Sequence, residues 1–241
     1  MKGIILAGGT GSRLSPLTKV TNKHLLPVYN KPMIYYPLQS LQLAGIDQIL
    51  IVSGKGHAGH FLELLGDGRE LGVHLSYAVQ EEPGGIAQAL NLAEDFADEG
   101  PVAVVLGDNI FDHNLSSAVH DFTKQEKGAK IFLKKVDHPE QYGIAFIKNE
   151  KIEKIVEKPK NSASNLAVIG VYFYDAQVFK VIKNLKPSSR GELEITDVNN
   201  FYLQQDILTY EIMKGWWGDA GESIDTLFET ARILYNKVNQ K

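Results

Sequence analysis

Short apolar runs of the kind that form β-strands alternate with helical patterns through the first half of this 241-residue chain. The strand-like runs cover residues 3–6, 48–53, 73–79, 102–106 and 130–136, and the helical patterns between them cover residues 33–44, 61–65, 86–96 and 115–125. Alternation of this kind predicts an α/β fold with a parallel or mostly parallel sheet that helices cover on both faces. Pro37 falls inside the first helical pattern, where we expect it to kink the helix.

The second half of the chain has more closely spaced strand-like runs. They cover residues 144–147, 151–156, 168–174 and 208–211, and helical patterns lie near residues 176–184, 193–204 and 223–238. No Pro/Ser-rich linker, repeat or low-complexity tract separates the two halves. We therefore expect a single domain over residues 1–241, in which the second half adds strands to the sheet of the first.

The first apolar run leads into a loop with glycines at positions 8, 9 and 11, and the loop is followed by Arg13 and Lys23. Glycines bring bare backbone N–H groups close to a ligand, so a strand that ends in such a loop before two cations suits a polyphosphate. The spacing does not match a Walker A loop, and Leu14 stands where the dinucleotide fingerprint has its third glycine. An ordinary glycine-rich turn is the alternative, and the two cations favour phosphate binding over it.

Composition excludes several classes of protein. The net charge of −4, without a compensating basic stripe, argues against a nucleic-acid partner, so cations that bind phosphate must be local to a pocket. The chain has no cysteine, which excludes disulfides, thiolate catalysis and zinc–cysteine sites. The N-terminus leads directly into a strand, and no apolar run reaches membrane-spanning length. We therefore expect a cytoplasmic protein without a membrane partner.

Polar segments follow several of the strand-like runs. They are residues 8–13, 80–85, 107–109 and 157–158. Ligands of open α/β sheets bind outside the carboxyl ends of the strands. We therefore expect these four segments to converge on one crevice.

Asp108 is the first candidate for metal binding. A carboxylate directly after a buried strand is costly unless it is paired or bound to a metal, although it can also cap the next turn. Mg²⁺ prefers one or two protein carboxylates together with substrate phosphates and waters. Asp219, in the string WWGDAG, is a candidate second ligand, with an N-cap of the final helix as its alternative.

Two further segments carry charge that could serve a cleft. Pro159 should end the preceding strand and hold Lys158 extended, so that Glu157 and Lys158 face the cleft, whereas an exposed Glu-Lys pair is more often solvated surface. Arg190, in the string RGELEITD, has the same alternative of a surface residue before a helix.

Taken together, these residues resemble the sugar-phosphate nucleotidyltransferases. The matching strings, spread in the family's order over residues 3–221, are LAGGTGSRLSPLT, NKHLLPVYNKPMIYYPL, GGIAQAL, VLGDNIF, EKP, VYFYD, RGELEITDVN and WWGDAG. Each string is weak alone, but the ordered set is highly specific. The resemblance implies a Rossmann-like three-layer nucleotidyltransferase fold with a mostly parallel mixed central sheet. It also implies a nucleotide-binding part of about residues 1–136 and a sugar-phosphate part of about residues 137–241.

The activity that the resemblance implies is nucleotidyl transfer from dTTP to glucose 1-phosphate, which gives dTDP-glucose and pyrophosphate and depends on Mg²⁺. The nucleophile is a phosphate oxygen that is already largely ionised at neutral pH, because the second pKa of a phosphate monoester is about 6, so no general base is required. The obstacle is repulsion between two polyanions. Cations offset it and stabilise charge on the α-phosphate during in-line displacement.

The resemblance implies a role for each motif residue. Nucleotide binding falls to Leu6, Ala7, Gly8, Gly9, Gly11, Arg13, Lys23, Gln80, Pro83, Gly85 and Asp108. Within this set, Gln80 and Gly85 would contact the base. Sugar-phosphate binding falls to Asn109, Gly143, Glu157, Lys158, Tyr172 and Arg190, and Mg²⁺ binding to Asp108 and Asp219. The catalytic set is Arg13, Lys23, Asp108 and Lys158.

Three departures limit the transfer of family properties. His24 stands where many dTTP-using members have glutamine, and Glu222 stands where threonine commonly follows the DAG string. The chain also stops soon after its last helix, whereas longer relatives continue into an effector site. Feedback inhibition there is therefore not expected, and a homo-oligomer is an open prediction.

Other functions stay open at this stage. A transferase that uses UTP is the nearest alternative, because thymine and uracil differ by one methyl group, a discrimination of about 1–3 kcal/mol. A different sugar 1-phosphate is another. A catalytically silent, ligand-sensing relative would be expected to have lost an acid or a cation, yet all five are present: Arg13, Lys23, Asp108, Lys158 and Asp219.

Overall fold

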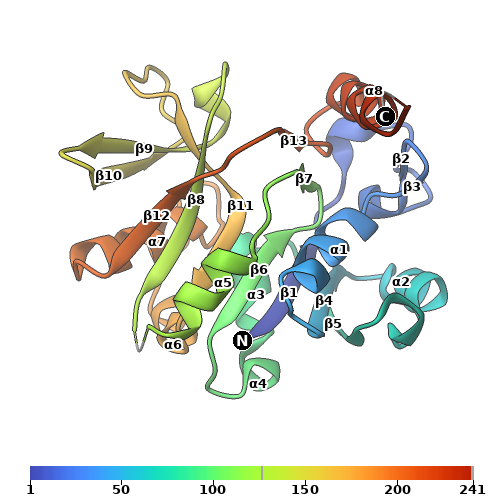
Figure 1. Ribbon diagram of the computed structural model, residues 1–241, viewed down its shortest axis with the longest axis horizontal. Helices are drawn as coiled ribbons and strands as arrows, with labels where there is room; N and C mark the ends of the chain where they lie inside the picture. Colours follow the sequence, from blue (N-terminus) through green and yellow to red (C-terminus); the bar gives the residue numbers. More distant parts are fainter. Residues whose placement is uncertain (126, 240–241) are drawn as a thin grey trace.

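The computed structural model describes residues 1–125 and 127–239, and its middle layer is a nine-stranded mixed sheet (Figure 1). Four neighbouring strands of the first half form its parallel part in the order β6-β1-β4-β5. They are β1 (Lys2–Ala7), β4 (Gln48–Gly54), β5 (His74–Gln80) and β6 (Val102–Leu106). The strands β1, β4 and β6 are apolar almost throughout because helices cover both of their faces.

The second half extends this sheet beyond β6. The strand β11 (Leu166–Tyr174) pairs antiparallel with β6 and with β8 (Ala129–Lys135), and β12 (Leu208–Ile212) then pairs parallel with β8. A hairpin of β9 (Gly143–Lys148) and β10 (Lys151–Glu157) joins the first residues of β11. The expected α/β fold with a mostly parallel mixed sheet is therefore confirmed.

Helices cover both faces of the sheet and make three layers (Figure 1). One face packs against α3 (Ile86–Asn91), α4 (Glu94–Ala97), α6 (Gln177–Lys183) and α7 (Ile195–Gln204). The other packs against α1 (Tyr35–Leu43), α2 (Ala58–Leu65) and α5 (Ser116–Thr123). Adjacent residues of β1 serve opposite cores, since Ile4 belongs to the first and Ile5 to the second.

Two short ribbons lie outside the main sheet, and neither was expected from the sequence. One pairs β2 (Pro27–Val28) with β3 (Lys31–Pro32). The other pairs β7 (Asn109–Phe111) with β13 (Trp217–Asp219), which are far apart in the chain. The final helix α8 (Ile224–Asn239) packs on both ribbons through a small core of its own.

Two helix expectations were wrong. Pro37 does not kink its helix, because α1 begins at Tyr35 and Pro37 lies in the first turn, where backbone N–H groups have no partner within the helix. The single helix expected over residues 86–96 is two helices, because the backbone tightens at Leu92 and Ala93, whose N–H groups donate to carbonyls only three residues back.

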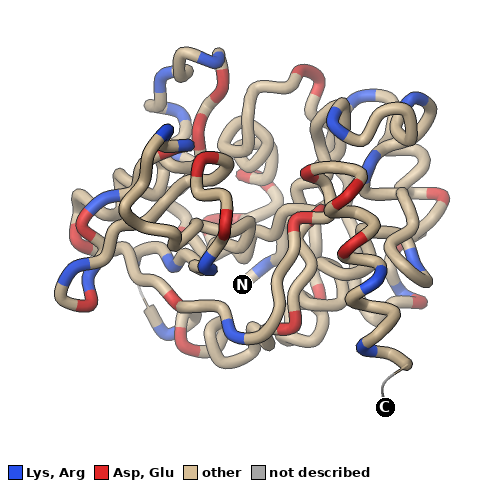
Figure 2. The backbone as a smooth tube through the Cα atoms, turned by 90° about the horizontal axis from the view of Figure 1, so that it is seen from above, with Lys and Arg blue, Asp and Glu red and all other residues tan. Residues whose placement is uncertain are grey.

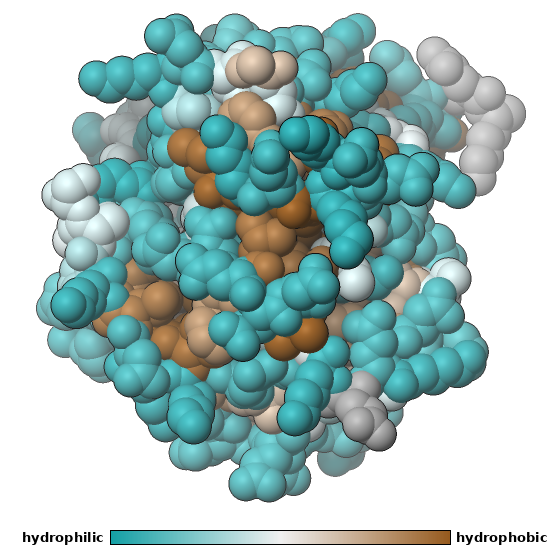
Figure 3. All heavy atoms as spheres, turned by 90° about the vertical axis from the view of Figure 1, so that its left-hand side faces the viewer, coloured by the Kyte–Doolittle hydropathy of each residue, from teal (hydrophilic) through white to brown (hydrophobic). Residues whose placement is uncertain are grey.

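The surface carries charges of both signs. Figure 2 shows lysine and arginine interspersed with acidic residues along the described chain rather than gathered in one stripe. On the face at the left of Figure 1, apolar side chains show between hydrophilic ones (Figure 3). Within residues 1–125 and 127–239, no helix has the length and apolar character needed to cross a membrane.

We expect Phe173→Ala to lower the free energy of unfolding by about 3–5 kcal/mol, because it opens a cavity in a packed core. Phe173 is fully buried on β11, and its ring centroid lies 5.1 Å from that of Phe132 and 5.7 Å from that of Phe122. Urea unfolding measures the loss. Phe228→Ala removes the same side chain where it is 70% exposed and should cost less than about 0.5 kcal/mol. Equal losses in the two variants would contradict this core.

Candidate active site

A cavity of about 400 Å³ lies at the carboxyl ends of the parallel strands and is lined by residues from both halves of the chain. All of the site residues that the sequence indicated line it, except Ala7 and Gly11. The four polar segments expected at strand ends therefore do meet at one crevice. Ala7 is fully buried, and its carbonyl accepts a hydrogen bond from Asn22, so it shapes the wall rather than lining it.

The glycine loop after β1 needs its glycines for two different reasons. Gly9 and Gly11 have φ angles of 88° and 62°, which side chains rarely tolerate. Gly8 is needed for space, because a Cβ there would lie 2.7 Å from Oε1 of Gln80. Arg13 follows the loop, is exposed, and forms no ion pair with any residue that the structure describes. The loop thus offers backbone N–H groups and an uncommitted guanidinium to an anion.

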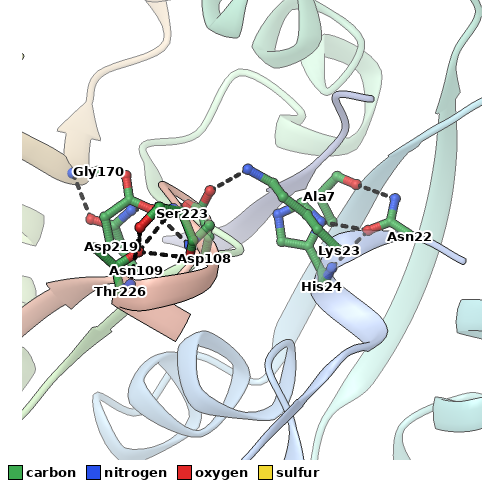
Figure 4. A network of polar contacts seen from close by, with 11 residues as sticks. Ala7, Asn22, Lys23, His24, Asp108, Asn109, Gly170, Asp219, Ser223 and Thr226 are labelled. Atoms are coloured by element: carbon green, nitrogen blue, oxygen red, sulfur yellow. Dashed lines mark hydrogen bonds and ion pairs between the residues drawn. The ribbon is translucent and has the colours of Figure 1, made fainter. Parts of the chain in front are cut away.

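A short 3-10 helix, Lys23–Leu25, is fastened to the end of β1 by Asn22. The Asn22 side chain accepts from the His24 backbone N–H at 2.9 Å and donates to the Ala7 carbonyl at 3.1 Å (Figure 4). Its oxygen also lies 2.7 Å from Nδ1 of His24, so Nδ1 carries the hydrogen of a neutral ring. Burial and the charge of Lys23 lower the pKa of His24 to about 3, which keeps the ring neutral.

Lys23 and Asp108 form a largely buried ion pair (Figure 4). Burial alone would lower the pKa of Lys23, but the Asp108 carboxylate raises it above its usual value. Burial alone would likewise raise the pKa of Asp108, but Lys23 holds it well below its ordinary range. Both groups are therefore charged at neutral pH, and Asp108 does not serve as a cap of the following turn.

The β7–β13 ribbon brings Asp219 beside Asp108. Asp219 pairs across the ribbon with Asn109, and the Ala220 N–H donates to the Asp108 carbonyl at 3.0 Å. Burial and the charge of Asp108 raise the pKa of Asp219 to about 7. Asp219 does not cap α8, since the Ser223 hydroxyl accepts from the Thr226 N–H there. Two carboxylates that raise the cost of each other's charge are suited to a cation.

Asn109 holds this acidic corner in place. Its amide nitrogen donates to Asp108 at 3.0 Å, and its oxygen accepts from the Gly170 backbone N–H at 3.1 Å and from the Trp217 indole at 2.8 Å. The protein thus holds the oxygen and one amide hydrogen of Asn109, whose side chain is almost fully buried. Among the described residues, no cluster of three acidic or histidine side chains is arranged for a metal, so a bound cation would need ligand phosphates or waters as well.

The other half of the cavity carries a second polar group of residues. Glu157 accepts a hydrogen bond from the Thr196 hydroxyl. A Cβ at Gly143 would lie 2.9 Å from that hydroxyl oxygen and 3.2 Å from the Glu157 carboxylate, so glycine keeps this wall open. Tyr172 is buried below them, and burial raises the pKa of its hydroxyl above the ordinary value. This wall offers hydroxyl and carboxylate groups to a polar, uncharged ligand surface.

The two cations of this half differ in how free they are. Arg190 donates to Glu194 at 2.7 and 3.2 Å and lies 3.5 Å from both Glu157 and Glu192. The hydrogen bond to Glu194 raises its pKa further. Lys158 is exposed and forms no ion pair within the part of the chain that the structure describes. Lys158 is therefore the cation more readily available to an anion.

The backbone of Lys158 corrects one expectation. Its φ angle is 43°, whereas an extended conformation was expected before Pro159. A tertiary contact accompanies the difference, because its N–H donates to the Tyr142 carbonyl at 3.0 Å.

Several residues that line the cavity were not among the expected site residues. They are His24, Ile86, Ala89, Leu106, Gln141, Tyr142, Val168, Ile169, Gly170, Glu192, Glu194, Ile195, Thr196, Trp217 and Glu222. Some lie inside the matching strings, as Glu192 and Glu194 do in RGELEITD, but their type alone does not separate a site residue from a solvated one. Tyr142 donates to Glu222 at 2.8 Å and packs edge-to-face on Trp217, which joins the two sides of the cavity.

Comparisons with known proteins agree with this geometry. Residues 2–236 match the family model described as nucleotidyl transferase. The glucose-1-phosphate thymidylyltransferase of Neisseria meningitidis is 45% identical over 99% of this chain and 84% of its own, and that of Xanthomonas campestris is 48% identical over 97% and 80%.

Solved structures give the same result. A structure described as a glucose-1-phosphate thymidylyltransferase from Bacillus anthracis in complex with a sucrose superposes with a TM-score of 0.93 at 54% identity, covering 97% of this chain and 94% of its own. A UDP-glucose pyrophosphorylase complexed with UDP-glucose gives 0.84 at 26% identity, with 98% of each chain covered.

We expect Asp219→Asn to raise the melting temperature in EDTA, and to raise it more at pH 8 than at pH 5. The folded chain holds a proton on Asp219 up to about pH 7, whereas the unfolded chain releases it near its ordinary value of 3.8. The stability of the unaltered protein is therefore lost as pH rises through this window. Thermal unfolding by circular dichroism measures the gain. Asp137→Asn, at an exposed loop position, is the matched control, and an equal gain there would contradict the assignment.

Proposed function

The chain belongs to the nucleotidyl transferase family, and from this membership we propose that it transfers a nucleotidyl group from dTTP to glucose 1-phosphate. The products are dTDP-glucose and pyrophosphate. The observation that carries the proposal is the similarity to glucose-1-phosphate thymidylyltransferases, at 45–48% identity over nearly the whole chain. The geometry of the cavity supports it, because anion-binding groups lie on two sides of one acidic corner.

The reaction needs charge more than it needs proton transfer. An oxygen of the sugar phosphate attacks the α-phosphorus of dTTP, and the bond from that phosphorus to the bridging oxygen of the β-phosphate breaks, so that pyrophosphate leaves. The attacking oxygen is already ionised at neutral pH, so no general base is required. What limits the reaction is the repulsion between the two anions, and positioned cations reduce it.

We assign the nucleotide to the side of the glycine loop. Arg13 and the loop N–H groups would bind the triphosphate, and Lys23 would interact with the departing pyrophosphate. Gln80 and Gly85, with Leu6 and Pro83, would border the base. Arg13 supports this assignment, since its guanidinium forms no ion pair with the described residues and can bind a phosphate without first leaving a carboxylate.

We assign the sugar phosphate to the opposite side. Glu157, with Gly143 and Tyr172, would contact the glucose ring, and Lys158 would bind its phosphate. Arg190 would assist from within its group of three carboxylates. Asn109 holds the acidic corner through its oxygen and one hydrogen of its amide nitrogen, and the second hydrogen of that nitrogen would donate to the sugar phosphate.

Members of this family generally depend on a divalent metal, and the acidic corner fits one. Asp108 and Asp219 are the residues that would hold Mg²⁺, because burial and mutual repulsion raise the pKa of one of them, a cost that a cation relieves. When bound, Mg²⁺ supplies positive charge to the phosphates of the nucleotide. Lys23 supplies a second positive charge at the same place through its contact with Asp108.

A transferase that uses UTP is the second candidate. It is favoured by the likeness to a UDP-glucose pyrophosphorylase, although at only 26% identity. The difference between the two bases is one methyl group, which an apolar pocket distinguishes by about 1–3 kcal/mol. A catalytically silent relative is disfavoured, because the same cavity is lined by all five charged residues: Arg13, Lys23, Asp108, Lys158 and Asp219.

Three expectations from the sequence stay predictions. They are a single domain over residues 1–241, a cytoplasmic location and a homo-oligomer. Light scattering on the purified protein would test the last of these.

Pyrophosphate release over a matrix of nucleoside triphosphates and sugar 1-phosphates tests the proposed function. We expect dTTP with glucose 1-phosphate to give the highest kcat/KM. EDTA should abolish the release, and excess Mg²⁺ should restore it. A matrix in which this pair gives no release, or in which EDTA has no effect, would overturn the function or the metal requirement respectively.

We expect Lys158→Ala to raise the KM for glucose 1-phosphate about tenfold or more, because a charge-assisted hydrogen bond to phosphate contributes about 1.5–3 kcal/mol. The KM for dTTP should change by less than about twofold, because Lys158 is assigned to the sugar phosphate and not to the nucleotide. Steady-state pyrophosphate release measures both constants. Lys160→Ala is the matched control, because Lys160 is exposed two residues away and does not line the cavity. Equal effects on both substrates would contradict the placement of Lys158.

A further inference from the structure

The orientation of the Gln80 side-chain amide is set by Gln88. Gln88 lies in the first turn of α3, and its Oε1 accepts from the Gly84 backbone N–H at 3.1 Å. A backbone N–H can only donate, so the Gln88 atom at that place must be the oxygen. The position of this acceptor therefore follows from the fold.

A second hydrogen bond, from Gln80 to Gln88, fixes the orientation of the Gln80 amide at the cavity. Nε2 of Gln80 donates to the same Gln88 oxygen at 2.6 Å and lies 3.5 Å from the Gly85 carbonyl. Turning the Gln80 amide over would place its oxygen against two acceptor oxygens, which is unfavourable. Both hydrogens of Nε2 thus face the protein, and Gln80 keeps only an acceptor for a ligand.

The acceptor lies on the cavity wall. Gln80 and Gly8 both line the cavity, and a Cβ at Gly8 would lie 2.7 Å from Oε1 of Gln80. The hydrogen bonds from Gly84 to Gln88 and from Gln80 to Gln88 form a relay. Gly84 lets the Gln88 amide lie close to the backbone, because any Cβ there would overlap that amide. A side chain at either glycine would therefore displace one of the amides in this chain of hydrogen bonds, which runs from Gly84 through Gln88 to Gln80.

We propose that Gln88 is a positioning residue for base selection, because it forces Gln80 to present an acceptor and so admits only a pyrimidine with a hydrogen on N3. The proposal rests on the function proposed above, in which Gln80 borders the base. Thymine has one N–H group when attached to its sugar, at N3, so an acceptor can serve it only there. Cytosine has a lone pair at N3, which would face the lone pairs of Gln80.

These hydrogen bonds therefore discriminate between bases by the hydrogen on N3 and not by the 5-methyl group. Thymine and uracil both carry N3–H, so the relay treats them alike. Cytosine leaves the oxygen of the largely buried Gln80 without a donor, and such mismatches are costly. A mutation in the relay should thus alter selection against cytosine and leave selection for the methyl group unchanged.

The test uses three nucleotides and two variants. Pyrophosphate release with glucose 1-phosphate gives kcat/KM for dTTP, dUTP and dCTP in the unaltered protein, in Gln88→Met and in Gln88→Glu. Methionine has a similar length but offers no strong acceptor, whereas glutamate keeps an acceptor for both the Gly84 N–H and Gln80. Circular dichroism and dTTP binding by calorimetry establish that each variant is folded.

We expect the dTTP:dCTP ratio of kcat/KM to fall about tenfold or more in Gln88→Met, an amount comparable to the loss of one hydrogen bond. In Gln88→Glu the ratio should stay within about threefold of the unaltered protein, as the retained acceptor requires. The dTTP:dUTP ratio should not change in either variant.

Two results would overturn the proposal. One is a folded, dTTP-binding Gln88→Met that keeps the dTTP:dCTP ratio. The other is a variant in which both ratios fall together, since that indicates a pocket loosened as a whole. Failure of the proposed function is distinguishable from both, because the unaltered protein would then release no pyrophosphate from dTTP and glucose 1-phosphate.

Discussion

The ion pair between Lys23 and Asp108 is the interaction on which the cavity depends. It links the segment fastened to the end of β1 with Asp108, two residues after β6, and these two strands are neighbours in the sheet. Burying either charge alone would be costly, so each partner makes the other possible in this place. Asp219 is buried beside an acid that is already ionised, and burial together with that charge raises the pKa of Asp219. Two acids share this corner with one lysine, so an additional positive charge would be stabilised there.

Segments remote in sequence meet at this corner through the β7–β13 ribbon. The ribbon places Asp219 across from Asn109, and the Trp217 indole donates to the same Asn109 amide that holds Asp108. Tyr142 adds a link from the β9 side to Glu222, close to the start of α8. The two halves of the chain therefore share one set of hydrogen bonds around the acids. A shift of either half would move the carboxylates, so the position of these groups reflects the packing of the whole sheet.

The sequence predicts the main sheet well because its buried parallel strands are short, continuous apolar runs, as in residues 102–106. The site residues that end such strands, Asp108 and Gln80 among them, could be placed for the same reason. The ribbon could not, because three-residue strands show no periodicity. The engagement of Arg190 with Glu194 was also invisible, since a charged residue before a helix looks the same whether it is paired or free. Strand pairs and ion pairs between distant segments are set by tertiary packing, so a local sequence pattern cannot predict them.

The charges around the cavity indicate that a metal would do more than relieve the repulsion between the two acids proposed to hold it. Among the described residues, six carboxylic acids and four cationic side chains line the cavity, so acidic groups outnumber cations there. Three of those carboxylates surround Arg190, and one is paired with Lys23, whereas Arg13 and Lys158 form no ion pair with residues 1–125 or 127–239. In the proposed assignment each of them binds one of the two anions, and neither would lie between the anions at the point where they react. A divalent cation held by the acids would supply charge at that point, so the electrostatics of the cavity support the proposed metal requirement together with the chemistry of phosphoryl transfer.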